Sequence, residues 1–238
     1  MENINVLYIH GMGGGGDSRI PSILKEHINP YIEKCYAGMA DKGVSAPETG
    51  CPHVSVVVRT YSFDPEVAWG QISSWMEELK PALVVGESLG SLNAIRIKGV
   101  PHILVSPSLN APVYLGYLAF LALIPGVTQL FDRIYRPKDG DRQRLHFTFR
   151  TLRKYRRLRR EALANSSRAG GRDAFFAFFG TRDHYRRSGI VSIRTWRKYF
   201  GPSTYRVYEG THFMEEEFVL SLLMPKIVDS LFKLFYYL

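Results

Sequence analysis

A Gly-Glu-Ser-Leu-Gly pentapeptide at residues 86–90 constrains the fold of this 238-residue chain more than any other feature. The apolar run 82–85 leads into it as a short buried strand, and residues 91–97 leave it with the pattern of a helix. Glycines on both sides of Ser88 avoid the clash that a Cβ would cause in such a tight turn. The turn lifts the serine hydroxyl above a sheet, and the helix N-terminus directs backbone N–H groups at negative charge that develops there.

Three other segments place polar residues directly after an apolar run. His10 and Gly11 follow the run 4–9 and open a glycine-rich loop. Asp183 comes just after the run 174–179, and His212 comes after the run 204–208. Because parallel strands present their carboxyl ends at the same edge of a sheet, we expect the side chains of Asp183 and His212 to converge with Ser88.

The order of serine, aspartate and histidine along the chain, each on a suitable element, resembles the α/β-hydrolase superfamily. The resemblance covers nearly the whole chain, apart from a central insert. It implies an α/β-hydrolase fold with about six mostly parallel strands, the third to the eighth of the family's full sheet, flanked by helices. Because the first apolar strand starts near Ile4, the first two strands of the full fold are missing, as in the compact esterase and thioesterase-like branch.

The resemblance also implies a role for each residue of the site. Ser88 would be the nucleophile, His212 the general base and later the acid, and Asp183 the group that holds the imidazole in one tautomer. The oxyanion hole would consist of two backbone N–H groups, those of Leu89 and Met12. The residues that precede Met12 would support this loop from behind, namely His10 and Gly11. No metal or organic cofactor is expected.

Other carboxylates and imidazoles compete for these roles. Asp173 precedes its strand, which places it at the wrong end of the sheet. Asp64 follows the apolar run 54–60 and is the alternative to Asp183. His184 neighbours Asp183, and we interpret it as a residue at the rim of the site.

The glycine-rich loop also fits a dinucleotide-binding fingerprint, with glycines at positions 11, 13 and 16. That interpretation requires an acidic residue at the end of the next strand, about 20 residues further on. Here the next apolar run, 54–60, begins more than 40 residues later. No Lys-Ser or Lys-Thr pair follows the glycines, so the pattern of a P-loop is absent as well.

The order of apolar runs and helical patterns predicts one domain, residues 1–238, with a parallel sheet covered on both faces. The predicted strands are 4–9, 54–60, 82–86, 102–106, 174–179 and 204–208, and the predicted helices are 19–37, 65–79, 89–98, 188–199 and 213–236. The insert, residues 110–172, follows the fourth of these strands, where the superfamily commonly carries a cap. We expect a helical lid.

The positive charge of the chain is concentrated in this insert. Residues 132–168 contain 13 Arg or Lys and 4 Asp or Glu, and this excess equals the formal net charge of +9 of the whole chain. Apolar side chains recur every third residue from Phe149 to Leu158, so one helical face is apolar while the others are basic. We expect the apolar face to cover the serine and to form an acyl pocket. The alternative is a helix that only covers the sheet.

The basic insert bears on partners and location. It favours an anionic ester or thioester as substrate, or peripheral contact with an acidic membrane surface, whereas no nucleic-acid motif accompanies it. The apolar stretch 111–127 is too short and too interrupted for a confident membrane span. The two cysteines indicate no disulfide framework, and an early first strand leaves no room for a signal peptide, so we expect a cytoplasmic protein. The oligomeric state is left open.

The sequence therefore predicts a serine hydrolase that cleaves a carboxylic ester or thioester through an acyl-enzyme intermediate. Acyl transfer to another acceptor would use the same residues, because only the group that enters the pocket differs. The alternative from another class is a catalytically weak or silent scaffold that binds an acidic partner or a membrane surface through the basic insert.

Overall fold

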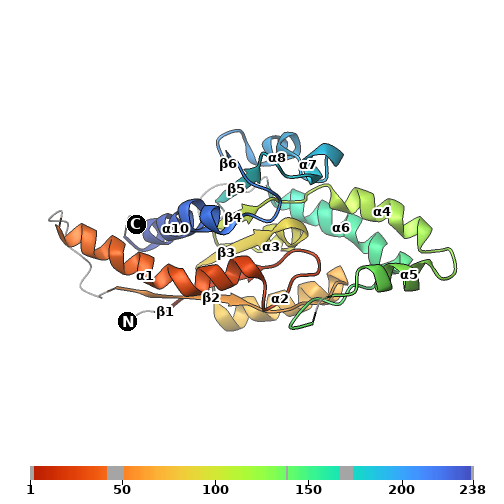
Figure 1. Ribbon diagram of the computed structural model, residues 1–238, viewed down its shortest axis with the longest axis horizontal. Helices are drawn as coiled ribbons and strands as arrows, with labels where there is room; N and C mark the ends of the chain where they lie inside the picture. The colour runs from red at the N-terminus through yellow and green to blue at the C-terminus, as the bar shows by residue number, and fades with distance from the viewer. Residues whose placement is uncertain (1–2, 42–50, 138, 167–173, 237–238) are drawn as a thin grey trace.

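Six parallel strands form a single sheet in the order β2-β1-β3-β4-β5-β6 (Figure 1). The computed structural model describes residues 3–41, 51–137, 139–166 and 174–236. The strands are β1 Asn3–Ile9, β2 His53–Val58, β3 Leu83–Glu87, β4 His102–Val105, β5 Phe175–Gly180 and β6 Tyr205–Tyr208. All neighbouring pairs run parallel, which confirms the expected parallel α/β sheet.

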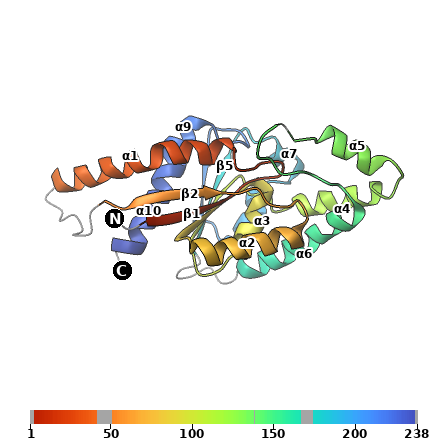
Figure 2. The same cartoon turned by 90° about the horizontal axis from the view of Figure 1, so that it is seen from below.

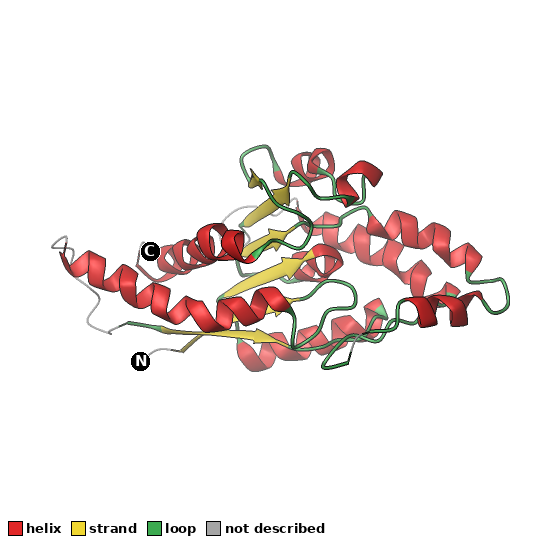
Figure 3. Cartoon of the chain, viewed as in Figure 1, coloured by secondary structure: helices red, strands yellow, loops and turns green. Residues whose placement is uncertain are grey.

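Helices cover both faces of the sheet, as Figures 2 and 3 show. They are α1 Arg19–Asp41, α2 Pro65–Leu79, α3 Ser91–Arg96, α4 Ala111–Leu121, α5 Val127–Ile134, α6 Phe149–Asn165, α7 Tyr185–Ser188, α8 Ile193–Phe200, α9 Glu216–Phe218 and α10 Met224–Tyr236. A short 3-10 turn, Ser88–Gly90, separates β3 from α3. Buried residues of α1 and α10 pack on one face, and those of α2, α3, α6 and α8 pack on the other.

The strands supply alternate residues to these two cores. In β1, Leu7 and Ile9 belong to the core under α2 and α3, whereas Val6 and Tyr8 belong to the core under α1 and α10. Successive side chains of a strand point to opposite faces, so a strand buried on both faces must be apolar throughout. This is why the central strands appear in the sequence as continuous apolar runs.

Two predicted helices are interrupted in the structure. The predicted helix 188–199 overlaps α7 only at Ser188, because Gly189 ends α7 with φ of 76°. The rest of the prediction corresponds to α8, which begins at Ile193, where the Ser192 side chain accepts from the N–H of Thr195. The predicted helix 213–236 begins at Glu216 and contains a π-helical segment, Val219–Leu223, before α10.

The described part of the insert consists of α4, α5 and α6. Helices α4 and α5 lie beyond the carboxyl ends of the strands, at the right of Figure 1, while α6 returns alongside α3. The apolar face of α6, with Leu152, Tyr155 and Leu158, is buried in the core that α2 and α3 share. Among the described residues, no helix combines the length and apolarity that a membrane span requires.

Candidate active site

The turn after β3 holds Ser88 in a conformation that few residues adopt. Ser88 has φ of 49°, in the left-handed region. A Cβ on Gly90 would lie 2.1 Å from the carbonyl oxygen of His10, and a Cβ on Gly86 would lie 2.7 Å from the Cβ of Ala94. Both glycines are therefore required by close packing against β1 and α3, and together they allow Ser88 to stand at the carboxyl edge of the sheet.

Ser88, His212 and Asp183 form one hydrogen-bonded chain. The Oγ of Ser88 lies 2.8 Å from Nε2 of His212, and Nδ1 of His212 lies 2.8 Å from Oδ2 of Asp183. The side chains of His212 and Asp183 are 2% and 0% exposed, so water does not compete for the bond between them. A carboxylate bound to Nδ1 leaves Nε2 as the acceptor for the serine proton.

The loops after β5 and β6 hold the carboxylate and the imidazole in place. The second oxygen of Asp183 accepts from the N–H of Tyr185 at 2.8 Å. The ring of Tyr185 meets that of His212 edge to face, with centroids 4.6 Å apart. On the other loop, the N–H of Thr211 donates to the Glu215 carboxylate at 3.0 Å. In each loop, a backbone N–H therefore donates a hydrogen bond to a carboxylate side chain of the same loop, and this bond holds the loop in shape.

The glycine-rich loop after β1 leaves one N–H group available near Ser88. The N–H groups of Gly13, Gly14, Gly15 and Gly16 donate to Gln143, Gly11, Ser18 and Thr60, respectively. Within the described part of the chain, the N–H of Met12 has no such acceptor. Met12 and Leu89 both line the cavity beside Ser88. A pair of N–H groups from these two segments is what an oxyanion hole requires.

His10 lies buried at the base of this loop. Its Nδ1 is 2.7 Å from the carbonyl oxygen of Gly11, so this nitrogen carries the proton and donates. Burial lowers the pKa of His10 to about 4, which keeps the ring neutral at pH 7. His10 therefore has the position expected of a residue that supports the loop from outside the reacting atoms.

The competing residues lie elsewhere. Asp64 caps α2 by accepting from the N–H of Glu66 at 2.9 Å, and it pairs with Lys154 at 2.7 Å. His184 is exposed, and its ring centroid is 6.1 Å from that of His212. Asp173 lies outside the described residues. The carboxylate that is linked to Ser88 through His212 is that of Asp183.

Sequence reasoning missed two neighbours of Ser88. The hydroxyl of Ser108 lies 3.1 Å from that of Ser88, and its N–H donates to the Ser88 carbonyl at 3.0 Å. Ser108 follows β4, the strand next to β3, so its position after an apolar run was a usable signal. Glu87, directly before Ser88, is half-buried and accepts from the hydroxyl of Tyr8 at 2.8 Å, and desolvation raises the pKa of its carboxyl.

A mainly apolar cavity of about 250 Å³ opens beside Ser88. One wall comes from α4, and others come from Tyr135 after α5 and from Tyr185 of α7. The described residues of α6 do not line it. The prediction that the apolar face of 149–158 forms an acyl pocket is therefore wrong, because this face packs against α2, α3 and α4, in the core that also holds Leu89 of the turn. The recurrence of apolar residues every three positions indicated that this helix buries one face, but not which elements that face packs against.

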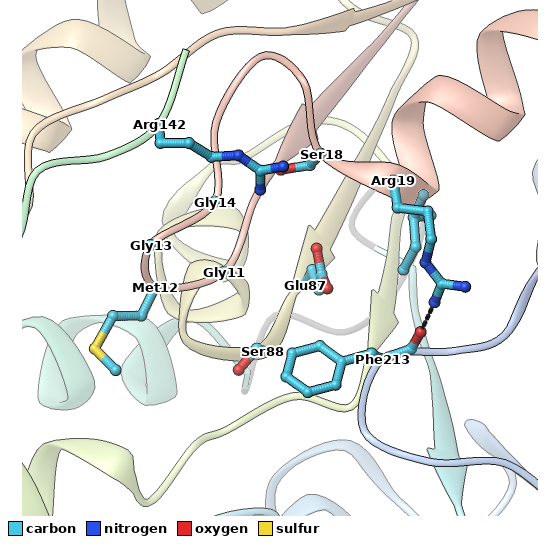
Figure 4. A pocket seen from close by; sticks show the side chains of 11 residues that line it. Gly11, Met12, Gly13, Gly14, Ser18, Arg19, Glu87, Ser88, Arg142 and Phe213 are labelled. Atoms are coloured by element: carbon cyan, nitrogen blue, oxygen red, sulfur yellow. Dashed lines mark hydrogen bonds between the residues drawn. The ribbon is translucent and has the colours of Figure 1, made fainter. Parts of the chain in front are cut away.

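A second cavity, of about 240 Å³, is lined by the glycine-rich loop and also by Ser88 and Phe213 (Figure 4). Arg19 and Arg142 flank the Glu87 carboxyl there. Arg142 pairs with Asp17 at 2.6 Å, and Arg19 donates to the carbonyl oxygen of Met214 at 2.7 Å. The insert thus supplies a guanidinium group to this cavity through Arg142 and not through the basic helix α6.

The described residues contain no group of three or more His, Cys, Asp or Glu side chains with the geometry of a metal site.

The chain was compared with known protein families, curated proteins and solved structures. No protein-family model and no curated protein matches the sequence. A malate-bound thermophilic esterase from Thermogutta terrifontis superimposes with a TM-score of 0.56 at 12% identity, over 98% of this chain and 90% of the esterase. An α/β-hydrolase fold protein from Burkholderia ambifaria gives a TM-score of 0.52 at 13% identity, over 96% and 91% of the two chains. A thioesterase domain from the curacin biosynthetic pathway gives 0.51 at 15% identity, over 95% and 91%.

These structures share the chain's parallel sheet and its helical layers over almost their whole length. The order of the six strands and the position of Ser88 after the central strand β3 agree with that result. This chain has the α/β-hydrolase fold.

Proposed function

We propose that this chain is a serine hydrolase that cleaves a carboxylic ester or thioester through an acyl-enzyme intermediate. One observation carries the proposal. The hydroxyl of Ser88 is 2.8 Å from Nε2 of His212, whose Nδ1 is 2.8 Å from the buried Asp183 carboxylate. A serine hydroxyl is a weak nucleophile unless a positioned base takes its proton, and this geometry supplies that base.

In the first half of the reaction, Ser88 Oγ attacks the carbonyl carbon of the ester while His212 Nε2 takes the hydroxyl proton. The resulting imidazolium is stabilised by Asp183, which stays ionised. The negative charge that develops on the carbonyl oxygen is assigned to the N–H groups of Met12 and Leu89. Loss of one donor of this kind typically costs about 100- to 1000-fold in rate.

In the second half, the same groups act in reverse. His212 gives its proton to the departing alcohol or thiol, which leaves an acyl group on Ser88. Water then enters next to Nε2, loses a proton to it and attacks the acyl carbonyl carbon. The acid is released as His212 returns the proton to Ser88 Oγ.

The cavity beside Ser88 supports an apolar acyl group as the substrate's main recognition element. Leu115 and Leu118 of α4 face it, together with Ile190. Proteins with this fold include ones described as an esterase and as a thioesterase. In this proposal α4 is the part of the insert that acts as a cap over the site. An anionic substituent stays a sequence-based prediction, and Arg19 and Arg142 are the two arginines that line the second cavity together with Ser88.

Covalent labelling tests the proposal directly. A fluorophosphonate should label the native protein at Ser88, and Ser88→Ala should lose both the label and the hydrolysis of p-nitrophenyl esters. Ser74→Ala is the matched control, because Ser74 is exposed on the distant helix α2. A silent scaffold predicts no labelling of the native protein, and labelling at another serine would contradict the assignment of Ser88.

A further inference from the structure

Exposed apolar side chains are concentrated at one end of the molecule. Among the described residues, 14 large apolar side chains are exposed, and 10 of them lie between Val113 and Tyr135. These ten form what we call the α4–α5 patch: Val113, Tyr114, Tyr117, Phe120, Leu121, Leu123, Ile124, Leu130, Ile134 and Tyr135. Contiguous apolar surface of this kind marks a place where another apolar surface binds.

Helix α4 is apolar on every side although only one side is buried. Leu115, Gly116 and Ala119 face the core, while Tyr117 and Phe120 on the opposite side are 65% and 51% exposed. No charged residue occurs from Ala111 to Phe131. A surface helix of a water-exposed protein normally carries polar residues on its outer face, so the composition of α4 indicates a second apolar partner.

The connection to α5 extends the apolar surface to the tip of the hairpin. Leu123 and Ile124, between the two helices, are 60% and 54% exposed. Within α5 no residue is buried, and Leu130 and Ile134 are 52% and 62% exposed. Figures 1 and 2 both show α4 and α5 as the end of the molecule farthest from its N-terminus. The patch thus projects outward without other described elements over it.

Cations surround this apolar surface. The ring of Phe149 packs against that of Phe120, with centroids 6.1 Å apart, and the guanidinium group of Arg153 lies over it at 5.6 Å. The guanidinium of Arg156 lies directly against Gly116 of α4. Arg133, on α5 itself, is exposed. Residues 111–160 contain twelve Arg or Lys and only three acidic residues, all Asp.

One of those three aspartates is held by local hydrogen bonds. Asp132 accepts from Nδ1 of His146 at 2.6 Å and from the N–H of Phe147 at 3.0 Å. Arg133, Arg153 and Arg156 therefore border the patch. An apolar patch bordered by arginines is complementary to a bilayer with anionic headgroups, because the apolar side chains enter the acyl boundary while the cations bind the headgroups.

We propose that the α4–α5 patch docks this protein onto the surface of a membrane that contains anionic lipid. The hairpin inserts shallowly at the interface and does not span the bilayer, in line with the absence of a spanning helix among the described residues. The chemistry of the partner is thus that of a phospholipid bilayer with net negative charge.

Docking would bring the bilayer next to Ser88. Tyr114 and Tyr135 belong to the patch and also line the cavity beside Ser88. The exposed side chains of Met12 and Phe213 line the same cavity. Resting on the proposed function, this continuity implies that an ester dissolved in the bilayer enters the site through the docked face.

Vesicle binding of the Ser88→Ala variant tests docking separately from hydrolysis. The protein should co-sediment with vesicles of phosphatidylcholine and phosphatidylserine. The combined change Tyr117→Ser, Phe120→Ser and Ile124→Ser should weaken this binding at least about 100-fold. Val67→Ser with Val207→Ser is the matched control, because both valines are exposed outside the patch. Since all these positions are exposed, thermal unfolding should show that each variant still folds.

A second set of variants tests the electrostatic contribution of the arginines to vesicle binding. Arg133→Ala and Arg153→Ala should each weaken binding to the anionic vesicles about fivefold at low salt, and added salt should reduce this difference. Lys25→Ala, an exposed position on α1, should leave binding unchanged.

Three outcomes would overturn the proposal. The first is that Ser88→Ala fails to bind anionic vesicles, and the second is that the patch variant binds as well as its control. The third is that sedimentation velocity shows a dimer abolished by the patch changes, with no vesicle binding, since a second copy would then be the partner. Loss of ester hydrolysis alone would count against the proposed function and not against docking.

Discussion

The imidazole of His10 is stacked on the phenol ring of Tyr61, with ring centroids 4.2 Å apart and planes 18° from parallel. The hydroxyl of Tyr61 donates back to the carbonyl oxygen of His10 at 2.5 Å. Two loops at the carboxyl edge of the sheet, one after β1 and one after β2, are thereby joined directly behind the glycine-rich segment. This pair holds the loop that carries Met12.

His10→Phe should flatten the dependence of stability on pH in the acid range, because phenylalanine keeps the stacked ring but does not titrate. The pKa of His10 is about 4 in the folded protein and 6.5 without burial. As pH falls below 6.5, the unfolded chain takes up a proton that the folded chain refuses until about pH 4. Stability present above pH 6.5 is lost across that window, by roughly 3 kcal/mol.

Urea unfolding at pH 7 and pH 4.5 measures this difference. His27→Gln is the control, because His27 is partly exposed on α1 and its replacement should leave the slope as in the native protein. Equal losses of stability for native protein and His10→Phe would show that the ring does not stay neutral in the fold.

Asp183→Asn should lower kcat by roughly 10⁴-fold with little change in KM, as replacement of a triad aspartate does elsewhere. Both oxygens of Asp183 accept hydrogen bonds, and in asparagine one of them is replaced by an uncharged NH₂ donor, so His212 is no longer held in one tautomer and its charge is no longer stabilised. Asp64→Asn is the matched comparison, because Asp64 caps α2 and pairs with Lys154. It should reduce thermal stability but leave kcat nearly unchanged, and the opposite pattern would exchange the roles of the two aspartates.

Gly90→Ala should prevent folding or destabilise the protein by several kcal/mol. A Cβ there would lie 2.1 Å from the backbone oxygen of His10, and neither β1 nor the turn after β3 has room to move. Gly70→Ala is the control, since nothing lies within 4 Å of a Cβ at that position in α2. It should stabilise the protein by about 0.5–1 kcal/mol through helix propensity. Urea unfolding measures both changes, and equal free energies of unfolding for Gly90→Ala and Gly70→Ala would contradict this steric argument.

If this chain has the proposed esterase activity, Leu118→Trp should shorten the acyl chain that it prefers. Leu118 lines the apolar cavity of about 250 Å³, and a larger side chain would occupy the space of several methylene groups. Each methylene excluded from an apolar site costs about 0.8 kcal/mol. In kcat/KM for p-nitrophenyl esters of graded length, the optimum should move to shorter chains. Val67→Trp, outside the cavity, should keep the native optimum, and an unchanged optimum in Leu118→Trp would exclude this cavity as the acyl site.

Much of the site was predictable because it depends on strand ends. In a parallel sheet the carboxyl ends of all strands meet at one edge, so residues after β3, β5 and β6 converge whatever the helices between them do. That is why Ser88, Asp183 and His212 could be selected together from a single sequence. The same argument, applied to β4, would have included Ser108.

The amino-acid sequence by itself determined the parallel sheet, its buried strands and the set of Ser88, His212 and Asp183, because local periodicity and strand polarity dictate them. Only the tertiary structure decided where the insert packs. The apolar face of α6 pairs with α2 and α3, while α4 forms the wall of the cavity beside Ser88 and exposes its other side. Periodicity tells that a helix buries a face, but the choice of partner depends on the fit of side chains that lie far apart along the chain.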